Sequence, residues 1–421
     1  MIASFKNNIT SINRANDENI FIVVCSFIFL IAPLPTIVLV SLVLLSREIN
    51  TKKSYFFLFV LLAFYMGAIN ATKTPEADQI AYYYAYQNIP TRGFLHALSN
   101  IYGEAVNSGG GKEFMFGFIN YVGYYLSFGY YPLFIFGFIT ALYMFLFSAI
   151  YKFYSYVNNR ACVIIAAVFL CAFFTQYFNL TLQLQRQFLA GAIMMYVLVV
   201  RAADKKNLWW LGLIAVFTHT SAGLFFPLLF IKPLTKRLRL TGFIVLAIMA
   251  ATFFVFSPQI GAVMAEATSF SSSLSYGFDR MAMGEANVDE ATGENYMFMY
   301  SAMLLVLALI FIILYRHRKE NENPLFFIYN TLIILVIFFF TMYSQPLTQY
   351  RYFMAAYSFF PFIFPNFFYK KSLANTVCLA GITLLLFVRF FLTFENIIWH
   401  YAPVQSILSD NIFSLVFNKH Y

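Results

Sequence analysis

Long apolar stretches dominate this sequence and constrain its fold more than any other feature. The stretch Phe21–Leu45 carries no charged residue, and Leu373–Phe391 carries only Arg389. At about 1.5 Å per residue, each is long enough to cross ~30 Å of hydrocarbon as a helix. Of the 421 residues, 61% are hydrophobic and only 11% are charged, far from the balance of a soluble domain. The sequence therefore predicts an all-α, polytopic integral membrane protein with about 10–12 transmembrane helices.

The basic residues set the predicted orientation. They gather in short loops between the apolar segments, and such loops face the cytoplasm. These loops also account for the net charge of +9, so we do not expect nucleic acid as a partner. Both ends of the sequence are then predicted to lie outside. The predicted crossings are Phe21–Leu45, Tyr55–Ile69, Leu133–Tyr151, Ala161–Tyr177, Phe188–Val200, Phe243–Phe256, Tyr296–Tyr315, Leu325–Tyr343, Tyr352–Phe364 and Leu373–Phe391.

Two apolar segments do not fit this orientation as full crossings. Leu208–Ile231 has basic clusters at both ends, which predicts a re-entrant hairpin broken near His219. Phe114–Phe128 is predicted as an interfacial or re-entrant helix on the outer face. A rival topology makes both segments full crossings and breaks the positive-inside rule at two loops.

The chain is predicted to form one membrane domain over residues 1–421. An outer loop with the interfacial helix covers residues 70–132, the hairpin covers 208–231, and a second outer loop covers 258–295. The first apolar segment has no small-residue cleavage site after it, so we expect a retained helix and no cleaved signal peptide. The four cysteines lie inside apolar segments, which argues against a disulfide framework and a zinc site.

Arginines inside polar islands are the strongest candidates for substrate binding. Insertion of a charged side chain such as Arg186 near the hydrocarbon layer costs at least ~2.5 kcal/mol of free energy. We therefore expect Arg186 to have a partner or an anionic ligand. A guanidinium group binds phosphate bidentately and stays charged. The alternative is snorkelling to the interface, or an intramembrane pair with an acidic residue. The candidate substrate-binding residues are the arginines Arg186, Arg351 and Arg389, together with Tyr82, Gln183, Gln187 and Tyr352.

Three further residues are candidates for acid–base chemistry. Asp78, Tyr82 and Tyr86 share a helix face, which predicts a carboxylate beside aromatic rings, unless this is an interfacial tyrosine belt. Glu113 opens an apolar helix, where it also suits the helix dipole. His219 lies at the predicted hairpin tip and could act as an acid or base, or could cap the broken helix. No His, Asp or Glu cluster has metal-ligand spacing, and no cofactor is expected.

The order of these islands resembles the EpsG-like branch of the Wzy polysaccharide polymerases. The motifs are Asp78-Gln79 with its following tyrosines, Glu113-Phe114, Arg186-Gln187, the run from His219 to Ala222, and Arg351-Tyr352-Phe353. The resemblance covers most of the chain, from about Asp78 to Phe353. One departure is the helix opening, where Gly117 follows Glu113 at a longer spacing than the compact Glu-x-Gly expected of the family.

The resemblance implies a surface-polysaccharide polymerase of GT-C-like membrane glycosyltransferase architecture in the bacterial cytoplasmic (inner) membrane. Its substrates would be oligosaccharide repeat units on undecaprenyl pyrophosphate at the outer face. Arg186 and Arg351 would bind the pyrophosphate, and Asp78 or His219 would activate the acceptor hydroxyl. Membrane lipid and a chain-length regulator of the Wzz type are candidate partners. An O-antigen ligase and a lipid-linked oligosaccharide flippase are the alternatives.

The predicted orientation can be tested by cysteine labelling. Single cysteines at Lys205 and Lys236 flank the predicted hairpin, so an impermeant reagent should label both only from the cytoplasm. Labelling of both from outside would contradict the orientation. Exposure of position 205 alone would favour the topology with two more crossings.

Overall fold

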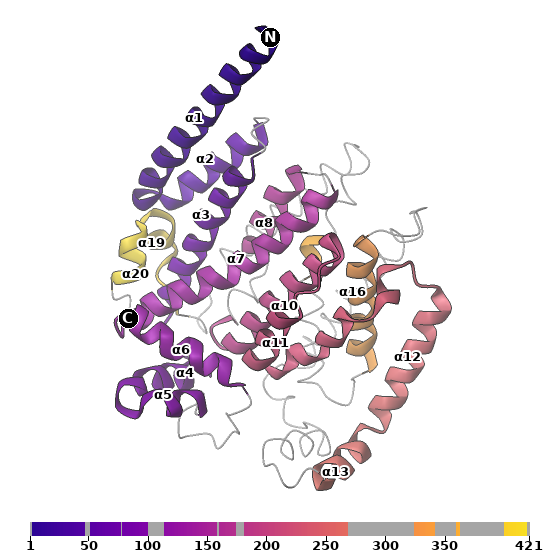
Figure 1. Cartoon of the computed structure of the whole chain (residues 1–421). Helices are drawn as coiled ribbons and strands as arrows, with labels where there is room; N and C mark the ends of the chain where they lie inside the picture. The colour runs from indigo at the N-terminus through magenta and orange to yellow at the C-terminus, as the bar shows by residue number, and fades with distance from the viewer. Residues whose placement is uncertain are drawn as a thin grey trace. The chain divides into compact units, whose positions relative to one another are not determined.

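The protein is helical throughout the part of the chain that the structure describes. The computed structural model describes residues 2–46, 51–76, 78–99, 113–157, 160–173, 181–267, 324–341, 359–362 and 400–418, and every regular element in these ranges is a helix (Figure 1). The predicted all-α fold class is thereby confirmed.

The first half of the chain contains most of the long helices. They are α1 (Ile2–Ile31), α2 (Pro33–Ser46), α3 (Lys52–Ala71), α4 (Asp78–Gln87), α5 (Ile89–Ser99), α6 (Phe114–Leu126), α7 (Tyr131–Val157), α8 (Arg160–Phe173) and α10 (Gln185–Asp204).

Shorter elements follow. They are α11 (Trp209–Thr218), the 3₁₀ helices η2 (Thr220–Leu224), η3 (Phe226–Leu229) and η4 (Lys232–Thr235), α12 (Leu240–Val255), α13 (Ser257–Ala267), α16 (Pro324–Thr341), η6 (Phe360–Phe362), α19 (Val404–Ser409) and α20 (Ile412–Phe417).

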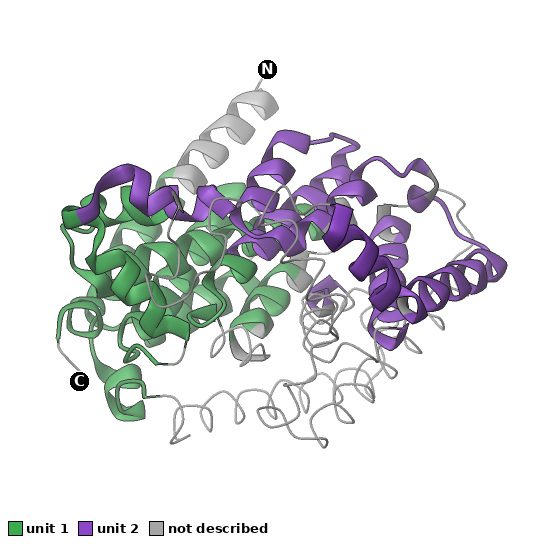
Figure 2. Cartoon of the chain, turned by 90° about the horizontal axis from the view of Figure 1, so that it is seen from below, with its two compact units in different colours: residues 1–91, 119–188, 371–421 green, residues 92–118, 189–370 purple. Residues whose placement is uncertain are grey.

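The chain folds into two compact units, coloured green and purple in Figure 2, with boundaries that fall within α5, α6 and α10. Unit 1 contains residues 1–91, 119–188 and 371–421. Unit 2 contains residues 92–118 and 189–370.

Three of the described helices are long and apolar enough to cross a membrane. They are α3, α7 over Tyr131–Ser155, and α10. Helices α12 and α13 together form a fourth candidate, bent by 60°. The helices predicted over Tyr55–Ile69, Leu133–Tyr151 and Phe188–Val200 are confirmed, and the chain is a multi-pass membrane protein. The crossings predicted at Tyr296–Tyr315 and Leu373–Phe391 lie outside the described residues.

The stretch Phe21–Leu45, predicted as one helix, is divided in two. Helix α1 ends at Ile31 and α2 begins at Pro33. A proline in a helix interior has no N–H for the ladder and collides with the preceding turn, whereas the first turn of a helix tolerates it. Pro33 therefore starts a new helix, and α2 packs against both α1 and α3.

The core of unit 1 is an antiparallel pair formed by α3 and α7. Phe59 stacks on Phe147 with ring centroids 5.4 Å apart, and further along the pair the Phe64 and Phe136 rings meet edge to face at 5.3 Å. The numbers rise along α3 as they fall along α7, so the helices run in opposite directions. Gly67 lets the two backbones approach closely, because a Cβ there would lie 2.7 Å from the Phe136 carbonyl oxygen.

The C-terminal end of α3 is tied to the C-terminal segment of the same unit. The N–H of Thr74 donates to the His400 carbonyl over 3.0 Å. Lys73 is only 2% exposed, and its Nζ lies 5.7 Å from the centroid of the Tyr401 ring. Burial lowers the pKa of Lys73 to about 8, although the nearby Glu76 acts in the opposite direction. These contacts hold the start of the first predicted outer loop against the core.

In unit 2, the predicted hairpin folds back on itself. Helix α11 leads to a tip at His219, and η2 and η3 form the returning leg. The legs pack together, since a Cβ on Gly212 would lie 3.2 Å from Leu229. The Leu229 carbonyl also accepts hydrogen bonds from Arg201 Nε at 3.2 Å and from Asn207 Nδ2 at 3.4 Å. The returning leg therefore ends beside the point where the hairpin begins. Its re-entrant insertion into the membrane stays a prediction.

The close approach at Gly67 can be tested by adding one methyl group. Gly67→Ala should lower the free energy of unfolding by about 1–3 kcal/mol, because the new Cβ overlaps the α7 backbone. Gly137→Ala in α7 is the matched control, since a Cβ there meets nothing within 4 Å. The control should be neutral or stabilising by up to about 1 kcal/mol. Thermal unfolding in detergent compares the two, and equal midpoints would contradict the packing.

Candidate functional site

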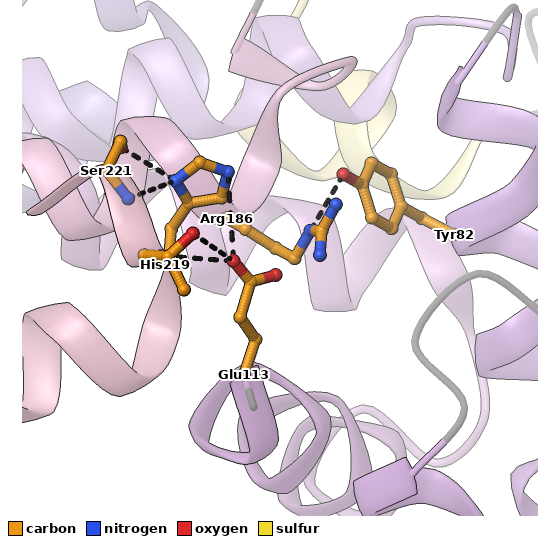
Figure 3. A network of polar contacts seen from close by, with 6 residues as sticks. Tyr82, Glu113, Arg186, His219 and Ser221 are labelled. Atoms are coloured by element: carbon orange, nitrogen blue, oxygen red, sulfur yellow. Dashed lines mark hydrogen bonds and ion pairs between the residues drawn. The ribbon is translucent and has the colours of Figure 1, made fainter. Parts of the chain in front are cut away.

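The described residues predicted for function form two groups of polar contacts (Figure 3). One group joins Arg186 to Tyr82 within unit 1. The other joins Glu113 to the hairpin tip around His219 within unit 2. Among the described residues, no cluster of three His, Cys, Asp or Glu side chains could hold a metal ion.

Arg186 lies in the first turn of α10 and is only 8% exposed. Its Nε donates to the Tyr82 hydroxyl over 3.2 Å, and the guanidinium carbon lies 5.8 Å from the centroid of the Tyr82 ring. The N–H groups of a helix's first turn have no partner within the helix, and the helix dipole makes this end positive. Charge and dipole therefore both favour an anion beside Arg186.

Helix α4 supplies the Tyr82 side of this contact. Tyr82 and Tyr86 are buried, as predicted for one face of a helix, and burial raises the pKa of Tyr86 to about 12. The third member of the buried face is Gln79, whereas Asp78 is exposed. The expected carboxylate beside the tyrosines is therefore replaced by an amide. Burying a neutral amide costs less than burying a charge, which explains the difference.

The residues around Arg186 extend the polar surface of unit 1. Gln185 is fully buried, and its Nε2 donates to the Tyr131 hydroxyl over 3.2 Å. Gln183 and Gln187 are half-buried. Arg351, Tyr352 and Arg389 lie outside the described residues. The sequence interpretation quoted Gln79 in the motif Asp78-Gln79 but gave it no role, and it did not select Gln185, which directly precedes Arg186.

Glu113 anchors the tip of the hairpin. Its carboxylate is buried, and Oε1 accepts the Thr220 N–H at 3.0 Å and the Thr220 hydroxyl at 3.3 Å. This N–H opens η2, where the helix dipole favours a negative charge. Gly117, one turn further along α6, allows the same helix to touch α5, because a Cβ there would lie 2.2 Å from the Ala97 carbonyl oxygen. The longer Glu-to-Gly spacing thus still gives a close backbone contact.

His219 has a defined orientation at this tip. Its backbone is extended (φ −155°, ψ 130°), ending α11 and starting η2. Nδ1 accepts the Ser221 N–H at 3.2 Å and lies 2.7 Å from the Ser221 Oγ. The neutral ring therefore carries its proton on Nε2, which lies 3.9 Å from Glu113 Oε1. The geometry shows the capping role, since Nδ1 accepts the Ser221 N–H at the start of η2. A proton gained at Nδ1 would displace this N–H and would give an imidazolium beside the Glu113 carboxylate.

The comparison with known protein families gives a match, and this match covers both groups of polar contacts. The model of the EpsG family matches residues 54–405, a range that contains all of the motifs from Asp78 to Phe353. No curated protein and no solved structure matches the chain.

The anchoring role of Glu113 can be measured at the tip itself. Glu113→Leu removes the acceptor of the Thr220 N–H, and a hydrogen bond to a charged acceptor contributes about 1.5–3 kcal/mol. Hydrogen exchange over residues 218–222 should therefore accelerate by at least about tenfold. Glu113→Gln keeps an acceptor oxygen, so the amides of residues 218–222 should exchange much more slowly in this variant than in Glu113→Leu. Equal exchange in Glu113→Leu and the wild type would show that the carboxylate does not hold the tip.

Proposed function

The chain belongs to the EpsG family, and on this premise we propose that it is a bacterial surface-polysaccharide polymerase. It joins oligosaccharide repeat units carried on undecaprenyl pyrophosphate at the outer face of the cytoplasmic membrane. Family membership supports a role in polysaccharide polymerisation. The buried arginine in the first turn of a membrane-length helix carries the finer assignment.

The proposed reaction transfers a glycan from its lipid carrier to an acceptor hydroxyl. The acceptor oxygen forms a bond to the anomeric carbon of the donor while the bond from that carbon to the pyrophosphate oxygen breaks. Undecaprenyl pyrophosphate leaves with the bonding electrons, and the hydroxyl proton passes to a base. The protein must therefore stabilise negative charge on one oxygen and remove a proton from another.

Arg186 fits the first task. Its charge lies in a buried setting, where electrostatic interactions are stronger than in water. The Tyr82 hydroxyl accepts from Nε and fixes the plane of the guanidinium. A planar group held in this way binds phosphate oxygens with defined geometry, and it needs no reorientation as charge develops on the leaving group. Arg351 is proposed to share this task.

The residues at the hairpin tip are suited to the second task, the removal of the proton from the acceptor hydroxyl. Nδ1 of His219 faces the Ser221 hydroxyl, which can pass on the proton of an acceptor hydroxyl. The resulting imidazolium would point Nε2 toward the Glu113 carboxylate, which stabilises the positive charge. Asp78 remains a second candidate base, and its exposed position gives it access to solvent.

Deletion of the gene separates this proposal from its alternatives. A polymerase acts after its substrate has crossed the membrane, so single repeat units should still reach the outer face of a deletion strain while long chains disappear. Loss of a flippase instead leaves the units on the cytoplasmic face. Loss of a ligase leaves long polymer on the carrier lipid. Profiling of carrier-linked and surface glycans distinguishes the three, and undiminished long chains would contradict the proposal.

Arg186→Lys tests the site in the same strain. Lysine keeps the charge but loses the planar fork and its Nε contact to Tyr82, so polymer formation should fall by at least about tenfold. Arg239→Lys, at an exposed position, is the matched control and should restore wild-type polymer. Both proteins should reach the membrane in equal amounts. Full complementation by Arg186→Lys would leave the arginine with only a structural role.

A further inference from the structure

Two fully buried glutamines accompany the Tyr82–Arg186 contact in unit 1. Gln79 and Gln185 are both 0% exposed. Among the described residues, neither Oε1 nor Nε2 of Gln79 has a hydrogen-bond partner, and Oε1 of Gln185 has none. A buried polar atom without a partner costs about 1–3 kcal/mol. Three such atoms in one part of the fold are costly unless a bound molecule satisfies them.

The two amides flank the same contact. Gln79 lies three residues before Tyr82, so the two share the buried face of α4 with Cβ atoms about 5–6 Å apart. Gln185 directly precedes Arg186 in the first turn of α10. The Arg186 Nε donates to the hydroxyl of Tyr82, which lies in the turn of α4 that follows Gln79. Each glutamine therefore lies within one helical turn of a residue of the Tyr82–Arg186 contact.

The chemistry of these atoms suits a hydroxyl group better than a phosphate. A carbonyl oxygen of an amide only accepts hydrogen bonds, and an ionised phosphate also only accepts. With the two amides oriented as in the structure, pyrophosphate cannot satisfy the Oε1 atoms of Gln79 and Gln185. A sugar hydroxyl can, because it both donates and accepts, and it also suits the donor Nε2 of Gln79.

We propose that Gln79 and Gln185 form a hydroxyl-binding subsite beside Arg186 that holds the sugar attached to the pyrophosphate. This subsite rests on the proposed function, since it extends the pyrophosphate site by one sugar. A site built to hydrogen-bond a hydroxyl group discriminates strongly against ligands that lack it. Gln79 and Gln185 would therefore distinguish the loaded carrier from bare undecaprenyl pyrophosphate.

Binding to two probes tests the subsite. The probes are undecaprenyl pyrophosphate and the same lipid carrying its repeat unit, the latter purified from the deletion strain. We expect the wild-type protein in detergent to bind the glycan-bearing probe more tightly than the bare lipid. Gln79→Met keeps the side-chain length but removes the amide, so it should weaken binding of the glycan-bearing probe by about tenfold and leave binding of the bare lipid unchanged. Gln87→Met, at the exposed end of α4, is the matched control and should change neither.

Folding and function are separated by further measurements. Replacing an unpartnered buried amide by an apolar group should leave the thermal midpoint unchanged or raise it. If Gln79→Met fails to fold, Gln185→Met and the shorter Gln79→Asn take its place, with the same expected loss for the glycan-bearing probe.

Each contrary result has its own meaning. A Gln79→Met protein that keeps the wild-type preference for the glycan overturns the subsite, and so does an equal loss for both probes, which would make Gln79 a positioning residue for Arg186. A wild-type protein that binds neither probe contradicts the proposed function itself.

Discussion

Backbone N–H and C=O groups that are removed from water need partners within the protein, and the irregular parts of this fold depend on that constraint. At the hairpin tip the helix ladder stops at Thr218, and side chains take over. His219 Nδ1 accepts the Ser221 N–H, and Glu113 accepts the Thr220 N–H. At the other end of the hairpin, Arg201 and Asn207 donate to the Leu229 carbonyl. His219 and Glu113, which accept the backbone N–H groups at this break in the helix, are therefore also candidate acid–base residues.

The sequence was sufficient for the helices whose pattern is simple. The apolar spans in α3, α7 and α10 and the break at His219 follow from hydropathy and from basic loops. The division of Phe21–Leu45 was not anticipated, because apolar composition alone does not show that Pro33 starts a new helix. Proline position, where it conflicts with hydropathy, is the better guide to helix ends.

The candidate site was only partly predictable, for a different reason. Arg186 and His219 stand out because charge and a polar tip are rare among apolar residues. Gln79 and Gln185 are uncharged, and nothing in the sequence shows that their amides are buried or which of their atoms have partners. The exposed Asp78 beside the buried Gln79 shows the limit of helical spacing, because a shift of one residue exchanges a carboxylate for an amide. Only the packing of α4 decides between them.

The proposed division between charge and amides has a consequence for product release. Arg186 would contact the pyrophosphate both before and after transfer, so this contact alone would favour retention of the product carrier. Contacts from Gln79 and Gln185 would belong to the sugar, which leaves the carrier when its anomeric bond breaks. The loaded carrier is then held by both sets of contacts, whereas the spent carrier keeps one. Neutral hydrogen bonds are suited to this purpose because they add specificity for the loaded carrier without adding to the charge that retains the leaving group.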